Sequence, residues 1–216
     1  MLKFGLRRCH SDHSVFSHTS NRGKILLIVY VNDIIVTRDD KQGIDDLKRY
    51  LQNSFRTKDL GKLCYFLSIE VARSKEGINL SQRKYVLDIL EETGLLGSKL
   101  VETPTDPNVK LYEDQGELLS NPERYRRLVG KLNYLTITRP DISFAVSVLS
   151  QFMKDPRLPH WEAVIRIVRY LKAHSGRGLL YKANGHLRVE AYIDADWVGS
   201  PSDRKSTTRY CTFLEI

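Results

Sequence analysis

The sequence predicts an α+β fold for the 216-residue chain. Two apolar, β-branched runs within residues 25–36 flank Asn32 and Asp33, and this pattern predicts a β-hairpin closed by a tight turn. Residues 121–173 instead carry caps, breaks and apolar residues spaced three or four apart, which predict three helices. Strand-like sequence returns at residues 178–194. Strands and helices therefore occupy separate stretches of the chain.

The composition is that of a soluble globular protein, with 41% hydrophobic and 28% charged residues. No apolar run approaches the ~20 residues that span a bilayer, and the N-terminus lacks the apolar region of a signal peptide. We therefore expect an intracellular protein without a membrane segment. Cys9, Cys64 and Cys211 are far apart, which indicates a reducing compartment without disulfides or a zinc site. Residues 9–18 hold three histidines and an aspartate, but their spacing fits no zinc pattern.

The elements of the first half follow from periodicity and turn residues. Apolar residues three or four apart predict a helix over 43–55, whose buried face is formed by Ile44, Leu47, Leu51 and Phe55. A strand at 64–71, a Glu76-Gly77 turn and a return strand at 78–80 come next. Ser81 is a candidate cap for a helix over 82–93, with Gly94 just past its end. Residues 100–115 read as a linker.

The second half begins with a strong helix start. Asn121 followed by Pro122 predicts a cap and a first helical position, with the helix running to Leu135. Two further helices are predicted at 142–153 and 160–173, the last with a buried face that includes Trp161, Val164, Val168 and Leu171. Residues 178–194 predict a hairpin turning at Asn184-Gly185.

Positive charge is concentrated in these helices. The net charge is +8, and residues 120–175 hold ten Lys and Arg against four acids. Such a surplus indicates a partner with a phosphate backbone, although a solvated basic surface gives the same count. The candidate nucleic-acid contacts are Arg124, Arg126, Arg127, Lys131, Arg139, Arg166 and Arg169.

The hairpin sequence Tyr30-Val31-Asn32-Asp33 resembles the Tyr-x-Asp-Asp hairpin of reverse transcriptases, in the Tyr-Val-Asp-Asp form of copia-type LTR retrotransposons. Asn32 stands where that family has the first catalytic Asp. Lys58-Asp-Leu-Gly61 and Tyr65-Phe-Leu-Ser-Ile-Glu70 are similar to the family patterns Lys-Asp-Leu-Gly and Tyr-Phe-Leu-Gly-Ile-Glu, which form its primer grip. The resemblance makes Tyr30, Tyr65 and Phe66 candidate nucleic-acid contacts. A second core hairpin is the alternative for residues 64–80.

The resemblance extends over essentially the whole chain. Tyr125–Leu135, Thr138–Val146 and Arg169–Lys172 resemble the thumb and connection region of the copia-type enzymes. The implied domains are a partial palm at 1–105, a helical thumb and connection at 106–175, and the incomplete start of a ribonuclease H-like domain at 176–216.

In the ribonuclease H-like part, the resemblance makes Asp194 a metal ligand and Asp196 a structural residue or cap. Arg209 stands where that pattern has a glycine, which would strain the backbone if the position required a positive φ.

The family resemblance implies Mg²⁺-dependent nucleotide transfer on an RNA–DNA hybrid or duplex. Reverse transcriptases hold two cations with three Asp, two at the hairpin turn and one on an upstream strand, which here would precede Met1. Of the turn pair only Asp33 is a carboxylate. Since hard cations require charged oxygen ligands, we expect Mg²⁺ not to be bound productively and this copy to be inactive.

Three interpretations remain open. The chain is a decayed reverse transcriptase fragment, or a nucleic-acid-binding module that uses the basic helices of residues 122–173. A third interpretation is a segment of a larger retroelement polyprotein that receives its missing strand from a neighbouring frame.

Overall fold

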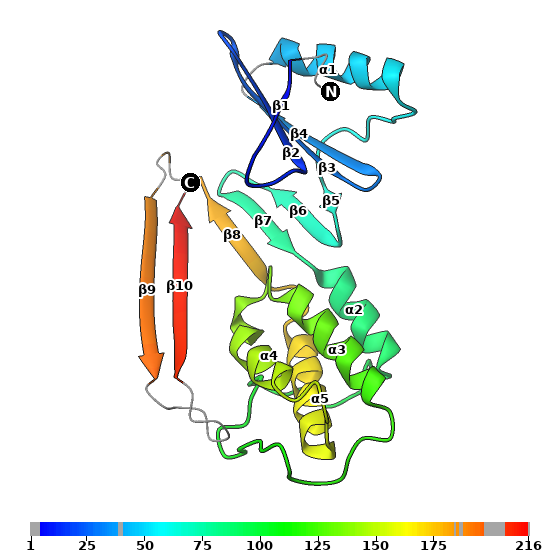
Figure 1. The fold of residues 1–216 in the computed structure, drawn as a ribbon, viewed down its shortest axis with the longest axis vertical. Coiled ribbons are helices and arrows are strands. Elements are labelled where there is room, and N and C mark those ends of the chain that lie inside the picture. The colour runs from blue at the N-terminus through cyan, green and yellow to red at the C-terminus, as the bar shows by residue number, and fades with distance from the viewer. Residues whose placement is uncertain (1–4, 39–40, 184, 186–187, 197–205, 216) are drawn as a thin grey trace. The chain divides into compact units, whose positions relative to one another are not determined.

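The computed structural model describes residues 5–38, 41–183, 185, 188–196 and 206–215, and it has the predicted α+β class (Figure 1). The chain divides into two compact units, Met1–Phe66 and Leu67–Ile216. Within the described part, every helix is too short or too polar to span a lipid bilayer.

The first unit contains a four-stranded antiparallel sheet with its strands in sequence order. The strands are β1 (Arg7–Arg8), β2 (Val15–Ser20), β3 (Gly23–Tyr30) and β4 (Asp33–Arg38). Helix α1 (Lys41–Ser54) follows, and the short strand β5 (Tyr65–Phe66) ends the unit. The predicted hairpin is confirmed, because β3 pairs with β4 and Tyr30 lies directly opposite Asp33.

One face of this sheet forms the core of the first unit. Ile25 and Leu27 of β3 pack with Leu47 and Leu51 of α1 in a buried cluster. Leu26 and Ile28, on the other face of β3, are only half-buried, so the hairpin is packed on one face and not on both. The helix prediction is right for Leu47 and Leu51 but wrong for Phe55, which follows the end of α1 and is 51% exposed.

The second unit contains an antiparallel sheet in which β7 (Gly77–Ser81) lies between β6 (Ile69–Arg73) and β8 (Gly178–Lys182). The predicted hairpin over residues 178–194 is therefore wrong, because β8 pairs with β7. Glycine explains this pairing: a Cβ at Gly178 would lie 2.1 Å from the Leu80 carbonyl oxygen. The close approach of the two backbones requires a residue without a side chain.

Strand β9 (Arg188–Asp196) pairs instead with β10 (Thr207–Glu215) in a two-stranded antiparallel hairpin. Ile193 and Tyr210 lie opposite one another in the ladder. Ile193 is 75% exposed and Tyr210 is 78% exposed. Tyr192 and Phe213 contact edge to face on the other side of the hairpin, and they are 62% and 55% exposed. Both faces of the hairpin thus carry exposed apolar side chains.

A tight turn interrupts the strand predicted at residues 64–71. Strand β5 ends at Phe66 and β6 begins at Ile69, while Leu67 and Ser68 have φ values of 48° and 62°. A positive φ favours glycine. Ser68 is the position at which the copia-type pattern Tyr-Phe-Leu-Gly-Ile-Glu has its glycine. The positive φ at this position explains why a glycine suits it.

We expect Ser68→Gly to stabilise the second unit by about 0.5 kcal/mol. Relief of the left-handed backbone gains about 1–2 kcal/mol, and the greater freedom of glycine in the unfolded chain offsets part of it. Urea unfolding followed by tryptophan fluorescence measures the change. Ser68→Ala is the matched control, since alanine keeps the strain, and a gain of equal size in Ser68→Ala would contradict the explanation.

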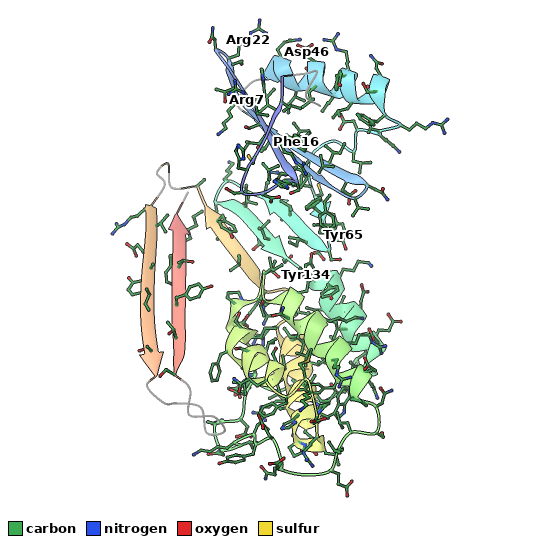
Figure 2. All side chains as sticks on the ribbon, viewed as in Figure 1. Arg7, Phe16, Arg22, Asp46, Tyr65 and Tyr134 are labelled. Carbon is green, nitrogen blue, oxygen red and sulfur yellow. The ribbon has the colours of Figure 1, made fainter. Side chains whose placement is uncertain are left out.

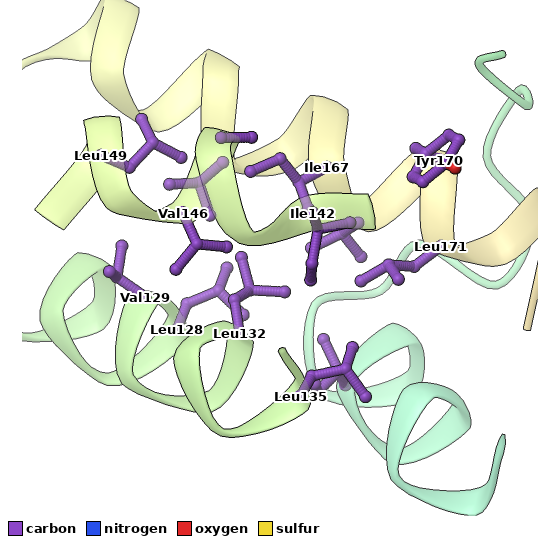
Figure 3. Packing of buried hydrophobic residues seen from close by; sticks show 14 of the residues in the cluster. Leu128, Val129, Leu132, Leu135, Ile142, Val146, Leu149, Ile167, Tyr170 and Leu171 are labelled. Carbon is purple, nitrogen blue, oxygen red and sulfur yellow. The ribbon is translucent and has the colours of Figure 1, made fainter. Parts of the chain in front are cut away.

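Four helices form the core of the second unit (Figure 3). They are α2 (Arg83–Glu92), α3 (Pro122–Leu135), α4 (Ser143–Ser150) and α5 (Leu158–Ala173), with a 3₁₀ turn η2 (Pro140–Ile142) before α4. Leu132 and Val146 are buried in this cluster, as are Val164 and Leu171. Trp161 is only partly buried against it. The helix predicted at 142–153 is shorter, because α4 ends at Ser150.

The predicted cap is confirmed for α3 and wrong for α2. The Asn121 side chain accepts a hydrogen bond from the Arg124 backbone N–H at 3.1 Å, which confirms the predicted cap of α3. The prediction that Ser81 caps α2 is wrong, since Gln82 occupies the cap position without a side-chain bond. Glu70 of β6 accepts from the Lys84 backbone N–H at 2.8 Å instead.

The predicted linker at residues 100–115 contains no helix or strand, and a buried histidine anchors the segment. His160 stacks on Phe152, accepts from the Arg157 backbone N–H at 3.0 Å through Nδ1, and contacts the Tyr112 carbonyl oxygen at 3.0 Å through Nε2. Burial lowers the pKa of His160, which favours the neutral ring with its proton on Nε2. The linker is thus attached to α5 through its backbone.

Candidate nucleic-acid interface

The tip of the β3–β4 hairpin presents one carboxylate. Val31 has a φ of 50° and is 82% exposed, and Asn32 and Asp33 are exposed beside it. Tyr30 is 51% exposed and lies opposite Asp33 in the ladder. Since opposite residues of an antiparallel pair share a face, the Tyr30 ring and the Asp33 carboxylate lie on the same side of the sheet.

These donors do not fit a paired-cation site. Two Mg²⁺ ions require several charged oxygens, whereas the tip offers the Asp33 carboxylate and the neutral Asn32 amide. Across the part of the chain that the structure describes, no group of three His, Cys, Asp or Glu side chains could hold a metal ion. That search includes the described histidines of residues 9–18.

The two aromatic candidates of the primer-grip-like segment lie at the end of the first unit. Tyr65 and Phe66 form β5, where Tyr65 is 51% exposed and Phe66 is half-buried. The exposed Tyr65 ring is accessible to a partner. A contact between either side chain and nucleic acid stays a prediction.

Helix α3 carries a stripe of cations along one side. Arg124, Arg127 and Lys131 are spaced by three and four residues, so they follow one another on the same helical face. The Arg124 guanidinium lies 4.8 Å from the centre of the Trp161 ring. Tyr134, which is labelled in Figure 2, continues the stripe, and its hydroxyl donates to the Leu67 carbonyl oxygen. We call these four side chains the α3 stripe.

One acidic residue of α2 meets the α3 stripe. Arg127 Nε lies 3.1 Å from Glu92 Oε1, and Lys131 Nζ pairs with Glu92 Oε2. The hydrogen bond from Lys131 holds the pKa of the Glu92 carboxyl below its usual value, and the positive charges of Lys131 and Arg127 add to this. Sequence analysis missed Glu92 and Tyr134, because no local pattern links residues 35 or 67 positions apart.

Two of the predicted basic contacts are structural instead. Arg126 donates from Nε to the Met153 carbonyl oxygen and from Nη2 to the Lys154 carbonyl oxygen, both at 2.8 Å. Arg139 is 1% exposed and forms a salt bridge with Asp141 at 2.7 Å. A buried, paired guanidinium cannot reach a phosphate, so we correct the assignment of Arg139. Arg126 is committed to backbone carbonyls in the same way.

The basic pair of α5 lines a separate cavity of about 980 Å³, between the linker and helices α4 and α5. Arg166 donates to Thr103 at 3.0 Å and pairs with Asp106 at 3.4 Å. The Nε atoms of Arg166 and Arg169 are buried without a hydrogen-bond partner. The α3 stripe is therefore the better candidate for a contact with a long polyanion.

The candidate ligand of the ribonuclease H-like part lies in β9. Asp194 is exposed and lies opposite Arg209 of β10 in the ladder. Arg209 belongs to a regular strand, while the side chains of Asp196 and Arg209 lie outside what the structure describes. The role of Asp194 as a metal ligand stays a prediction.

Comparisons with known proteins give a consistent picture. Residues 1–107 match the profile of the family described as reverse transcriptase (RNA-dependent DNA polymerase). The chain is 41% identical, over 99% of its length, to the retrovirus-related Pol polyprotein from transposon RE1 of Arabidopsis thaliana, but spans only 15% of that protein. No solved structure matches the chain.

Two shorter relatives are covered more fully. An uncharacterized mitochondrial protein of Arabidopsis thaliana is 39% identical, and the match covers 87% of this chain and 78% of the relative. A transposon Ty5-1 protein of Saccharomyces cerevisiae is 32% identical, and the match covers 99% of this chain and 70% of the relative. Chains of about this extent therefore occur beside the long polyproteins.

Proposed function

Because the chain belongs to the reverse transcriptase family of retrotransposon Pol polyproteins, we propose that it is a polymerase segment without polymerase activity of its own. The observation that carries this proposal is the hairpin tip, where Asn32 stands beside Asp33. An amide offers one neutral oxygen in place of a charged carboxylate. If the lost charge removes about 4 kcal/mol of transition-state stabilisation, the rate falls roughly a thousandfold.

A primer-extension assay tests this proposal. The purified chain is incubated with a homopolymer RNA template, a DNA primer and either Mg²⁺ or Mn²⁺. We expect no synthesis above the protein-free control, because no group of three His, Cys, Asp or Glu side chains among the described residues could hold a metal ion. Metal-dependent synthesis that Asp33→Asn abolishes would overturn the proposal.

Asn32→Asp is the matched variant for this assay. It restores one negative charge at the tip and leaves the length and branching of the side chain unchanged. We expect the variant to remain inactive, since it supplies two carboxylates where the family uses three. DNA synthesis by Asn32→Asp, but not by the wild type, would show that the Asn32 amide is the sole cause of the missing polymerase activity.

A second function is favoured by the α3 stripe. We infer that the chain binds an RNA–DNA hybrid or a duplex through the exposed Arg124 and Arg127 and the partly exposed Lys131, since cations in one row suit a phosphate backbone. Binding measured by fluorescence anisotropy should weaken as salt rises, with a log–log slope of about −2.7 for three phosphate contacts. Absence of binding at low salt would remove this function.

The ribonuclease H-like assignment of residues 176–216 also belongs to the proposal. It is supported by the resemblance of the sequence and by the antiparallel pairing of β9 with β10, which places Asp194 in a long strand.

A further inference from the structure

A single carboxylate holds two neighbouring cations of the α3 stripe. Glu92 places one oxygen 3.1 Å from Arg127 Nε and the other against Lys131 Nζ. Arg127 and Lys131 are four residues apart, which puts them on adjacent turns of the same face of α3. The two oxygens of Glu92 are thus divided between a guanidinium and an ammonium group.

This arrangement is suited to a phosphate. Guanidinium groups bind carboxylates and phosphates through the same paired N–H geometry, and a lysine adds a point charge to either anion. A backbone phosphate presents two non-bridging oxygens, as a carboxylate presents two. The cluster of Arg127, Lys131 and Glu92 is therefore an anion site whose anion comes from the chain itself.

The cluster lies at the surface. The side chains of Arg127, Glu92 and Lys131 are 61%, 37% and 31% exposed. Exposed ion pairs contribute little to stability, so a polyanion can replace Glu92 at small cost. Arg124 and Tyr134 extend the same face on either side of the cluster, where further nucleotides would pass.

We propose that Glu92 is an internal competitor that occupies a phosphate-binding site formed by Arg127 and Lys131. This inference rests on the proposed binding of nucleic acid by the α3 stripe. When a phosphate of the nucleic-acid backbone binds, it takes the place of the Glu92 carboxylate between the two cations. The affinity of the wild-type chain is then lower than its cations alone would give.

The test compares two variants with the same change of charge. Glu92→Gln removes the competing charge but keeps the size of the side chain. Glu91→Gln changes the net charge equally, one residue away on α2, at an exposed acid outside the cluster. Binding of a fluorescein-labelled 20-base-pair RNA–DNA hybrid to the full chain is measured by anisotropy at several salt concentrations.

We expect Glu92→Gln to tighten binding about fivefold, while Glu91→Gln changes it less than twofold. Adding Lys131→Gln to Glu92→Gln should remove most of the gain and lower the salt slope by about 0.9. Thermal unfolding of each variant, followed by tryptophan fluorescence, shows whether α2 and α3 remain packed.

The outcomes separate the inference from the function on which it rests. If the wild type binds and Glu92→Gln binds equally well or more weakly than Glu91→Gln, the competitor role is wrong while nucleic-acid binding stands. Weaker binding would mean that Glu92 orients the two cations for the phosphate. If neither the wild type nor Glu92→Gln binds at low salt, both the binding function and the competitor role are overturned.

Discussion

Replacing Arg139 by alanine is expected to lower the free energy of unfolding of the second unit by about 3–5 kcal/mol. The Arg139 guanidinium is almost fully buried and makes three hydrogen bonds. Two go to the Asp141 carboxylate at 2.9 and 2.7 Å, and the third goes to the His174 carbonyl oxygen at 2.9 Å. Its removal leaves both acceptors without this donor.

The Asp141 side chain shows how strongly the pair is coupled. Its burial raises the pKa, but hydrogen bonds from Arg139 and the Tyr170 hydroxyl and the positive charge of Arg139 outweigh burial, so the pKa is held below 3.8. This contribution to stability is present above the unfolded pKa and is lost as pH falls through the lowered folded pKa. Because the Asp141 side chain is 33% exposed, water compensates part of the loss, which favours the lower end of the range.

Chemical denaturation followed by tryptophan fluorescence measures the effect of Arg139→Ala. Arg139→Lys is the control, because it keeps the charge but lacks the forked donors, and we expect an intermediate loss. The double variant Arg139→Ala/Asp141→Ala should lose less than the sum of the single losses, since the unpaired carboxylate is gone. A loss below about 0.5 kcal/mol for Arg139→Ala would contradict the structural role.

The second large effect is expected for Gly77→Ala, which should destabilise the β7–β8 pairing by about 3 kcal/mol or more. Gly77 has a φ of 145°, and a Cβ there would lie 1.9 Å from the Tyr181 carbonyl oxygen. The obstacle is backbone, so it cannot move aside as a flexible side chain would. Both conformational strain and steric overlap therefore oppose the alanine.

Other glycines of the chain separate these two causes. Gly94 has a φ of 71° but open space around it, so Gly94→Ala reports conformational strain alone, about 1 kcal/mol. Gly178→Ala reports overlap alone, and Gly97→Ala, in open space, should be nearly neutral. Hydrogen exchange of the β7 and β8 amides measures all four. Equal protection in Gly77→Ala and Gly97→Ala would contradict the account.

Local signals in the sequence were enough for most elements. Asn121 and Pro122 placed the start of α3, and the spacing of Leu47 and Leu51 placed the buried face of α1. Strand pairing was less accessible, because residues 178–182 pair with β7, about a hundred positions earlier in the chain. The turn signal at Asn184-Gly185 favoured pairing residues 178–182 with the strand that follows them, which is the wrong partner. The deciding feature was the close backbone contact at Gly178, which no periodicity reveals.

The candidate site shows the same limit. Counting charges identified the basic helices but gave Arg139 and Arg127 equal weight, although one is buried and the other is exposed. Burial depends on tertiary packing, and the partner of Arg127 comes from α2, 35 positions away. Only the family pattern identified Asn32 as a site residue, because an asparagine at this turn is informative only when the family has a catalytic Asp at the same position.

The β9–β10 hairpin has a consequence for the life of the chain in a cell. Aromatic and aliphatic side chains on both of its sides are open to solvent, among them Tyr192, Ile193 and Tyr210. Such a ribbon is what chaperones and quality-control proteases bind, and turnover is set by the least protected part of a protein. We therefore expect cellular abundance to follow this ribbon more closely than it follows the well-packed helices.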